Sequence, residues 1–209
     1  MLKRREFVSA LAGAALLILG AVTPTLASSI ETESSAFITS LAEKAVNSLT
    51  SKNAVRGQRI ERFRAIFNES FAVRSIGKFV LGRYWKKANE DERKEYLGLF
   101  EDLMVVSYVD RFAEYAGESL SVKKTRGENE STVTVFSEIE RPGGAKAIRI
   151  NWRVGTNGTI YKILDVVVEG TSMSSTLRSD FSSIVRRNGG KVAGLIEELR
   201  IKTAALKSE

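Results

Sequence analysis

Two residue types are missing from this 209-residue sequence: cysteine and histidine. Without cysteine the chain forms no disulfide and performs no thiol chemistry, so its stability must come from packing. Without histidine it cannot assemble a Ser-His-Asp or Cys-His catalytic centre, and it lacks the usual proton shuttle near neutral pH and the common transition-metal ligand. We therefore expect no metal site, no cofactor and no catalytic residue in this protein.

The sequence contains one long apolar run, residues 8–22, and no second run that could span a bilayer. This run is shorter than the roughly 20 residues that a transmembrane helix needs. It follows the basic residues 3–5 and precedes Thr25-Leu26-Ala27, a pattern typical of an export signal cleaved after Ala27. We predict a cleaved signal over residues 1–27, with an uncleaved anchor as the alternative. Residues 4–8 also resemble a twin-arginine motif, so a twin-arginine and a general secretory route both stay open.

The formal net charge is +7, and the basic residues after the signal are spread without a dense run. We interpret this as an ordinary solvated exterior; a preference for anionic lipid or an acidic partner surface is the alternative. Nucleic acid is not an expected partner of an exported protein. Residues 28–209 are long enough for one domain with a single core, and they contain no internal repeat or linker.

Helical spacing of apolar residues dominates up to residue 115. We predict helices over residues 30–51, around residues 60–67 and over residues 71–87, with Gly82 stopping or bending the third. Asn89 is expected to cap a long helix over residues 91–115, because acidic residues follow it in the first turn. The apolar stripe of this helix is unusually wide. It is either a central helix buried among neighbours or one that also lines an apolar cavity, and both interpretations stay open.

From Glu118 the apolar residues alternate with polar ones, which is the period of a strand. Turn signals at residues 127–129, 142–144 and 157–158 separate four such segments, and the last segment covers residues 159–168. The connections are too short for helical crossovers, so the segments should pair as an antiparallel meander. We predict an α+β fold, with a four-stranded antiparallel sheet wrapped by N-terminal and C-terminal helices.

The most informative stretch runs from Lys162 to Met173. It begins as a β-branched run, typical of a buried strand, and ends in Glu169-Gly170-Thr171-Ser172, where glycine lets the backbone turn and the hydroxyls can cap a helix. A last strand should therefore lead directly into a helix. That helix should end at Gly189-Gly190, and a final amphipathic helix should follow over residues 192–199.

Three spaced motifs resemble the MlaC family, the periplasmic lipid carriers also called toluene-tolerance auxiliary proteins. They are residues 81–85 (Leu-Gly-Arg-Tyr-Trp), residues 165–173 (Asp-Val-Val-Val-Glu-Gly-Thr-Ser-Met), and residues 178–181 (Arg-Ser-Asp-Phe) followed by Gly189-Gly190 and Leu195-Ile196. The resemblance covers nearly all of residues 28–209 in order and spacing. It implies a single lipid-binding domain whose sheet and helices enclose a deep apolar pocket for the acyl tails of a diacyl glycerophospholipid.

The resemblance also implies a function and partners. Such a protein would be a periplasmic monomer that shuttles phospholipid between an outer-membrane lipoprotein–porin complex and an inner-membrane ABC transporter with MCE domains, and so maintains outer-membrane lipid asymmetry. A related class is associated with hopanoids, so another lipid stays open as the cargo. A periplasmic adaptor with a filled core, which binds no lipid, is a further alternative.

Large apolar residues in the wide helix, in the strands and in the matched motifs are the candidates for lining the pocket. Ordinary core packing is the alternative for each of them. Thr171 and Val168 are the sharpest candidates because they lie where the last strand ends in the matched motif. The predicted lipid-binding residues are Tyr84, Trp85, Phe100, Met104, Tyr108, Ile148, Ile150, Trp152, Val166, Val168, Thr171 and Met173.

An enzyme is the rival class. Asp165 and Glu169 could form a carboxylate pair with Ser172 nearby. Along an extended strand the two carboxylates would lie roughly 13 Å apart, beyond the separation that either glycosidase mechanism uses. We therefore expect no enzymatic activity.

The pocket assignment yields one mutational prediction. Thr171→Glu would place a charge in an apolar cavity, which is costly without a partner, and should abolish the co-purification of lipid with the protein. Lipid extraction from the purified variant measures this. A folded variant that still carries its normal lipid would refute the placement of Thr171.

Overall fold

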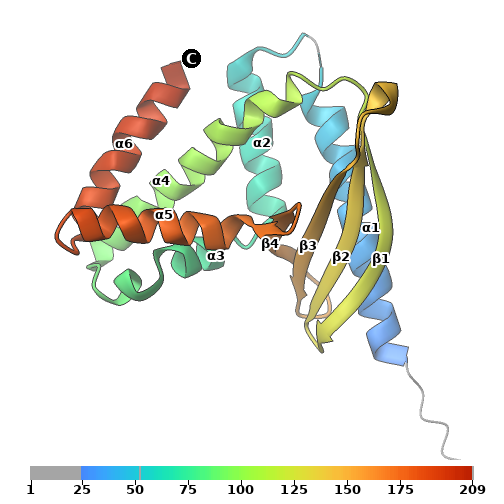
Figure 1. Cartoon of the computed structure of the whole chain (residues 1–209), viewed down its shortest axis with the longest axis horizontal. Coiled ribbons are helices and arrows are strands. Elements are labelled where there is room, and N and C mark those ends of the chain that lie inside the picture. Colours follow the sequence, from blue (N-terminus) through green and yellow to red (C-terminus); the bar gives the residue numbers. More distant parts are fainter. Residues whose placement is uncertain (1–24, 52, 209) are drawn as a thin grey trace, which may run out of the picture.

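The computed structural model describes residues 25–51 and 53–208. Within these ranges helices precede and follow a single block of strands, as predicted for an α+β fold (Figure 1). The α-helices are α1 (Thr25–Leu49), α2 (Arg56–Ser70), α3 (Val73–Leu81), α4 (Glu90–Tyr108), α5 (Met173–Arg187) and α6 (Val192–Ser208). The strands are β1 (Ser119–Asn129), β2 (Thr132–Glu140), β3 (Ile148–Thr156), β4 (Tyr161–Val168) and β5 (Thr171–Ser172). Short 3-10 helices are η1 (Gly82–Lys86), η2 (Val109–Phe112) and η3 (Pro142–Gly144).

The predicted export signal lies outside the described residues except for its last three, which form the start of α1. Of the helices in the described ranges, none has both the length and the apolar character that crossing a membrane requires.

The strands form one antiparallel sheet in the order β1-β2-β3-β4-β5. The first four are the predicted meander, but the prediction of four strands misses β5. After β4, Glu169 (φ 47°) and Gly170 (φ 85°) reverse the chain, and Thr171 then pairs with Val168. Positive φ at both central residues is the geometry of a tight hairpin turn. A strand of two residues has no alternation to detect, so the sequence showed only the turn and the helix cap.

A bulge in β4 decides which of its residues face the helices. Arg153 of β3 pairs with Asp165 while the next residue, Val154, pairs with Ile163, so Leu164 is an extra residue in β4. An extra residue shifts the alternation of faces by one. Ile163 and Val166 therefore lie on the same side of the sheet. Gly155 makes room for the bulge, because a Cβ there would lie 2.8 Å from Leu164 Cδ1.

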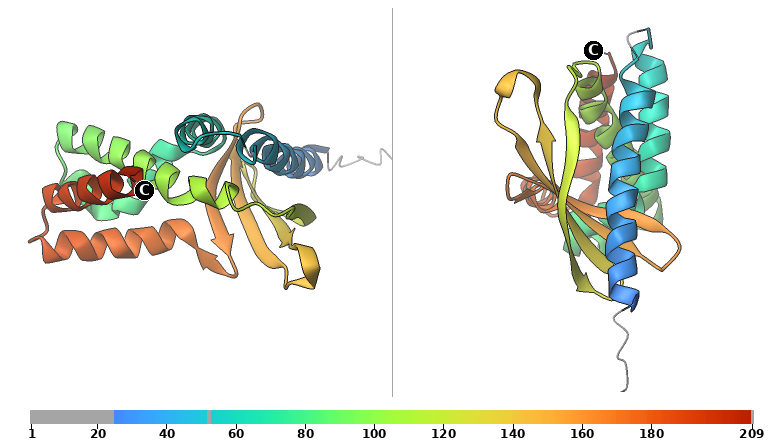
Figure 2. Two further views of the ribbon diagram at one scale, coloured as in Figure 1. Left: turned by 90° about the horizontal axis from the view of Figure 1, so that it is seen from above. Right: turned by 90° about the vertical axis from the view of Figure 1, so that its right-hand side faces the viewer.

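Helix α1 packs along this side of the sheet, with α2 beside it (Figure 2). The contact buries Ile38 of α1 against Val133, Val135, Val154 and Ile163, which are almost inaccessible to solvent. These residues form the first of two hydrophobic cores, which we call the sheet core. Its strand residues are the apolar members of the alternating pattern in the sequence.

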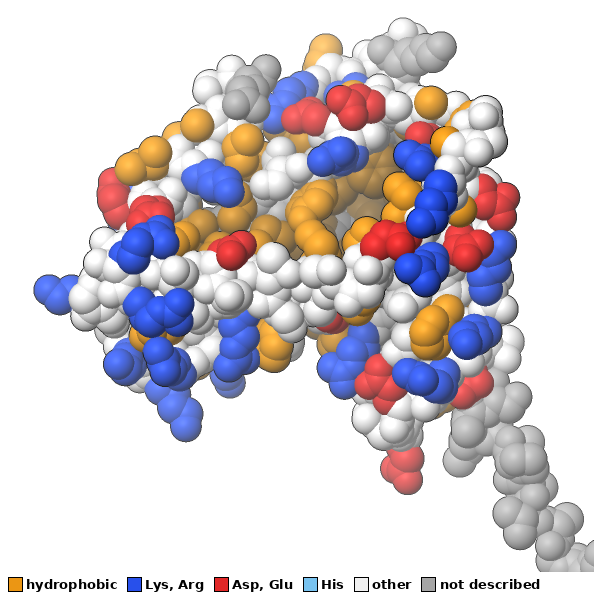
Figure 3. All heavy atoms as spheres, in the orientation of Figure 1, with side chains coloured by type: hydrophobic (Ala, Val, Ile, Leu, Met, Phe, Trp, Pro, Cys, Tyr) orange, Lys and Arg blue, Asp and Glu red, His pale blue; other side chains and the backbone are white. Residues whose placement is uncertain are grey.

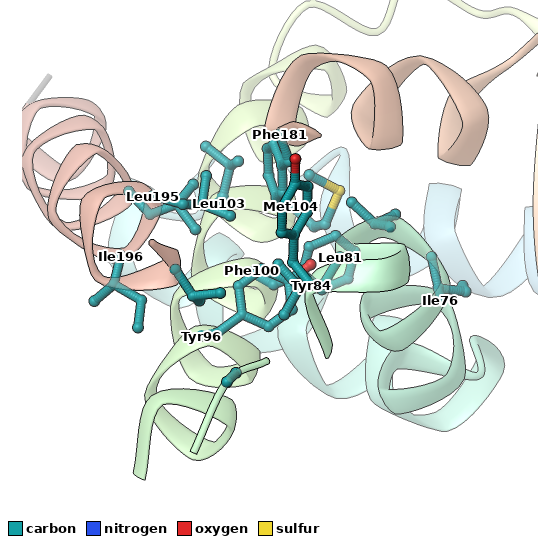
Figure 4. Packing of buried hydrophobic residues seen from close by; sticks show 14 of the residues in the cluster. Ile76, Leu81, Tyr84, Tyr96, Phe100, Leu103, Met104, Phe181, Leu195 and Ile196 are labelled. Carbon is teal, nitrogen blue, oxygen red and sulfur yellow. The ribbon is translucent and has the colours of Figure 1, made fainter. Parts of the chain in front are cut away.

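The second core, which we call the helical core, lies between α3, α4, α5 and α6 (Figure 4). Tyr96, Phe100 and Phe181 meet at its centre, with ring centroids 6.1 Å and 6.2 Å from Tyr96. The buried Tyr96 hydroxyl donates a hydrogen bond of 2.9 Å to the Gly77 carbonyl. Gly77 favours this approach of α3 to α4, since a Cβ there would lie 2.8 Å from Leu97 Cδ2 and would force that side chain to shift.

The predicted helix ends are largely confirmed. Gly82, with φ of 58°, ends α3, and Gly189-Gly190 follows the last turn of α5. Asn89 caps α4 in a reciprocal arrangement with Glu92, in which each backbone N–H donates to the other side chain at 2.9 Å. Helix α4 ends at Tyr108, earlier than predicted. The chain tightens there into η2 although the apolar pattern continues, so the pattern alone overestimated the length of the helix.

The cap of α4 can be tested by mutation. Asn89→Ala should lower the free energy of unfolding by about 1 kcal/mol, because the backbone N–H of Glu92 loses its acceptor. Urea denaturation of the purified protein measures this. Asn47→Ala is the matched control, since Asn47 is exposed in the last turn of α1, away from any N-terminal cap, and should tolerate alanine at no cost. Equal losses in both variants would contradict the role of the cap.

Candidate functional site

An apolar cavity lies between the sheet core and the helical core. Its volume is about 490 Å³, within the range of roughly 300–1,000 Å³ that is typical of ligand pockets. Almost all of its lining side chains are hydrophobic, and they come from α1 to α5, from η2 and from the first four strands. Figure 3 shows this face of the molecule hollowed, with hydrophobic side chains inside the hollow and charged side chains around it.

Helices α1 and α4 form two walls of the cavity. Phe100, Met104 and Tyr108 are spaced by four residues and so lie on one face of α4. Phe100 and Met104 belong to the helical core as well, so α4 contributes to the core and to the cavity lining. Both interpretations of the wide apolar stripe are therefore realised in one helix, and Phe100 and Met104 take part in both. The opposite wall contains small residues of α1, Ala42 and Ala45, which leave room between the helices.

The sheet contributes the floor, with Ile150 and Trp152 of β3 beside Val168 and Val166 of β4. The polar atom of the tryptophan is satisfied away from the cavity, because Trp152 Nε1 donates 2.9 Å to Ser137 Oγ. That hydroxyl in turn donates 2.8 Å to the Ile150 carbonyl. The indole can therefore present a purely apolar surface to the cavity.

The structure brings eight of the twelve predicted lipid-binding residues to this cavity and leaves four outside it. The eight that line the cavity are Phe100, Met104, Tyr108, Ile150, Trp152, Val166, Val168 and Met173. The four outside its lining are Tyr84, Trp85, Ile148 and Thr171.

Tyr84 and Trp85 belong to the far side of the helical core. Tyr84 is only 3% exposed in that core, and Trp85 packs against its outer edge, where Lys78 and Arg93 lie over the indole ring. A large aromatic residue just after a helix end can either pack in a core or line a cavity. Only the direction in which η1 leaves α3 decides between them.

Thr171 and Ile148 lie beyond the edge of the cavity. Ile148 is the first residue of β3, on the same face as Ile150 but one step past the floor. Thr171 is exposed in β5, because the turn at Glu169 carries it away from the floor. A charge at Thr171 would reach solvent, so the expected loss of lipid in Thr171→Glu does not follow from this structure.

Sequence reasoning missed the contribution of α1 and α2. Leu41, Ala45 and Leu49 recur every four residues within the first predicted helix, Phe63 and Phe67 do so within the second, and all of them line the cavity. The signal was present in the sequence, but an amphipathic stripe looks the same whether it covers a core or a cavity.

Three charged residues interrupt the apolar lining: Arg111, Glu118 and Asp165. Asp165 caps α5, since its carboxylate accepts 2.6 Å from Ser172 Oγ and 3.1 Å from the backbone N–H of Ser174. The Glu118 carboxylate accepts 2.8 Å from the backbone N–H of Ala116, and this bond lowers the pKa of Glu118.

The side chains proposed for the rival enzyme class all have structural roles. Asp165 and Ser172 hold the start of α5, and Ser172 Oγ also accepts from the backbone N–H of Ser175 at 3.1 Å. The Glu169 carboxylate binds the backbone N–H of Arg149 at 2.6 Å and its guanidinium at 2.9 Å, and these bonds lower the pKa of Glu169. Among the residues that the structure describes, no group of three or more acidic side chains is placed to hold a metal ion.

Comparisons with known proteins identify a family, a curated relative and a solved structure that this chain resembles. The family model described as MlaC protein matches residues 39–201. The chain is 24% identical over 117 residues to the intermembrane phospholipid transport system binding protein MlaC of Haemophilus influenzae, a match covering 54% of each protein. The chain thus matches about half the length of this curated relative. The fold resembles that of a phospholipid-binding protein from Ralstonia solanacearum solved in complex with a phospholipid, with a TM-score of 0.74 and 17% identity over 83% of this chain and 98% of that one.

The apolar character of the cavity can be tested at Val166. Val166→Glu places a carboxylate in the floor, where an unpaired charge is costly, and should weaken binding of a fluorescent fatty-acid probe by roughly tenfold or more. Fluorescence titration of protein stripped of bound ligand measures this.

Val167→Glu is the matched control, because the neighbouring residue in β4 points to the other face of the sheet and does not line the cavity. Thr171→Glu should also bind the probe normally. Equal weakening in the Val166 and Val167 variants would show that the probe does not enter this cavity.

Proposed function

Because the chain belongs to the MlaC family, we propose that it is a periplasmic carrier that encloses the acyl tails of a diacyl glycerophospholipid in this cavity. The observation that carries the proposal is the cavity itself: an unfilled, almost wholly apolar space between two packed cores. The similarity of this protein's fold to that of a phospholipid-binding protein solved with a phospholipid supports the choice of ligand.

The energetics of lipid transfer favour such an enclosure. Two acyl chains with about 30 methylenes in total would cost about 24 kcal/mol to expose to water, at about 0.8 kcal/mol each. A carrier therefore has to cover the tails nearly completely while it crosses an aqueous compartment. A cavity walled by helices on one side and a sheet on the other meets that need.

The proposed route runs between two membranes. The protein takes phospholipid from, or delivers it to, an outer-membrane lipoprotein–porin complex and an inner-membrane ABC transporter with MCE domains, and thereby maintains outer-membrane lipid asymmetry. The pocket cannot bind lipid far more tightly than a bilayer does, since it must also release it. Release then requires a partner that favours a more open state of the carrier. The predicted export signal is consistent with this location.

The proposed role is that of a carrier and not of an enzyme. The side chains considered for an enzyme, Asp165, Ser172 and Glu169, are engaged in capping α5 and in holding the turn after β4. No chemical step is needed to move a lipid from one site to another.

Native mass spectrometry of residues 28–209, followed by extraction and fragmentation of the bound molecule, tests the proposal. We expect one diacyl phospholipid per protein monomer. A hopanoid in its place would redirect the function to carriage of another lipid. A protein that is empty as purified, and that takes up no lipid from phospholipid vesicles, would refute the carrier and favour the adaptor.

A further inference from the structure

Arg111 is the one cationic side chain among the described residues that line the cavity. It lies in η2, directly after α4, where the chain leaves the helices for β1 (Figure 1). The side chain is exposed, whereas its neighbour Val109 is fully buried. Arg111 therefore stands at the rim, with the apolar lining on one side and solvent on the other.

Asp110, next to Arg111 in sequence, and the two carboxylates that line the cavity with it are engaged elsewhere. Asp110 accepts hydrogen bonds from Arg56 Nε at 3.1 Å and Nη2 at 2.9 Å. Glu118 accepts from a backbone N–H, and Asp165 caps α5. Arg111 itself makes no hydrogen bond or ion pair with any residue that the structure describes. Its charge is thus available to an anion at the rim.

Tyr108, the last residue of α4, precedes Arg111 by three residues. Tyr108 also lines the cavity, is 36% exposed, and its hydroxyl donates to no other described residue. Burial raises the pKa of the phenol, and the positive charge of Arg111 opposes that rise, which places the two groups in each other's field. The cavity lining therefore carries a cation and, three residues earlier in the chain, a neutral hydroxyl donor.

We propose that Arg111 and the Tyr108 hydroxyl bind the phosphodiester of the lipid whose acyl tails occupy the cavity. A guanidinium offers a planar fork of donors that matches two phosphate oxygens, and a hydroxyl can donate to a third group of the same ligand. The inference rests on the proposed carrier function and adds a specificity to it: the protein prefers lipids that carry a phosphodiester over lipids with the same tails and no phosphate.

The test compares two lipids that differ only in the phosphodiester head group. Protein stripped of lipid is incubated with phosphatidylcholine vesicles that contain a minor fraction of diacylglycerol with the same acyl chains. Mass spectrometry of the re-isolated protein gives the ratio of bound phosphatidylcholine to bound diacylglycerol, normalised to the vesicles. Arg111→Gln should lower this ratio roughly 3–10-fold, as expected for the loss of a partly solvated charge-assisted contact.

Three further variants separate the subsite from general effects. Arg74→Gln removes the same charge from an exposed position of α3 outside the cavity lining, and should leave the ratio unchanged. Tyr108→Phe keeps the ring and removes the hydroxyl, and should lower the ratio by less than Arg111→Gln does. Arg111→Lys should restore part of the preference, because it restores the charge without the fork.

Salt and free phosphate provide independent readouts. The preference of the unmodified protein should fall as ionic strength rises, whereas that of Arg111→Gln should stay nearly constant. Inorganic phosphate should have no more effect than sodium chloride of equal ionic strength; specific competition by phosphate would mean that the rim binds free phosphate and would overturn the lipid assignment.

The outcomes distinguish the subsite from the carrier function. Normal loading of Arg111→Gln with an unchanged ratio would refute the phosphodiester subsite and leave the carrier intact. Failure of the unmodified protein to take up either lipid would refute the carrier, and the subsite with it.

Discussion

Strand β4 is attached to helices on both of its sides, and we relate the space between the two cores to those attachments. On one side, Ile163 pairs with Phe71 between α2 and α3, and its carbonyl accepts 2.9 Å from the backbone N–H of Ala72. On the other side, Asp165 holds the first turn of α5 through Ser172 and Ser174. These bonds hold the start of α3 and the start of α5 next to β4. The floor residues Val166 and Val168 face a space that no side chain fills.

The stability of the fold comes from the two packed cores, because the apolar surface of the cavity is not buried by other side chains. Each is closely packed: the sheet core buries Ile38, Val133 and Val154, and the helical core buries Tyr96 and Phe100. An apolar wall that faces water forfeits roughly 25 cal/mol per Å² of unburied surface. A lipid tail in the cavity would recover that energy, so in the proposed carrier the ligand acts as a missing part of the core. This coupling links the stability of the protein to its loading.

Charged side chains are common on the outer face of the sheet and rare at the cavity. The sheet face turned away from the helices carries pairs such as Arg153 with Glu128, 2.8 Å apart, which are typical of a solvated surface. At the cavity the charged side chains are few, and both carboxylates serve the backbone. Arg111 is the exception, and its position at the end of α4 is what makes the rim chemically distinct from the lining.

The sequence by itself determined the elements and the composition of their faces. Asn89 with Glu92, Gly82 and Gly189-Gly190 mark helix ends through local backbone chemistry, and the alternation in β2 and β3 marks the buried face of the sheet. Only the tertiary structure decided which apolar faces meet and which leave a gap. Tyr84 and Ala45 both lie on apolar helix faces, yet one fills a core and the other lines the cavity. The bulge at Leu164 and the pairing of β5 were likewise invisible, because burial depends on contacts between segments that are distant in sequence, whereas periodicity records only which side of an element is apolar.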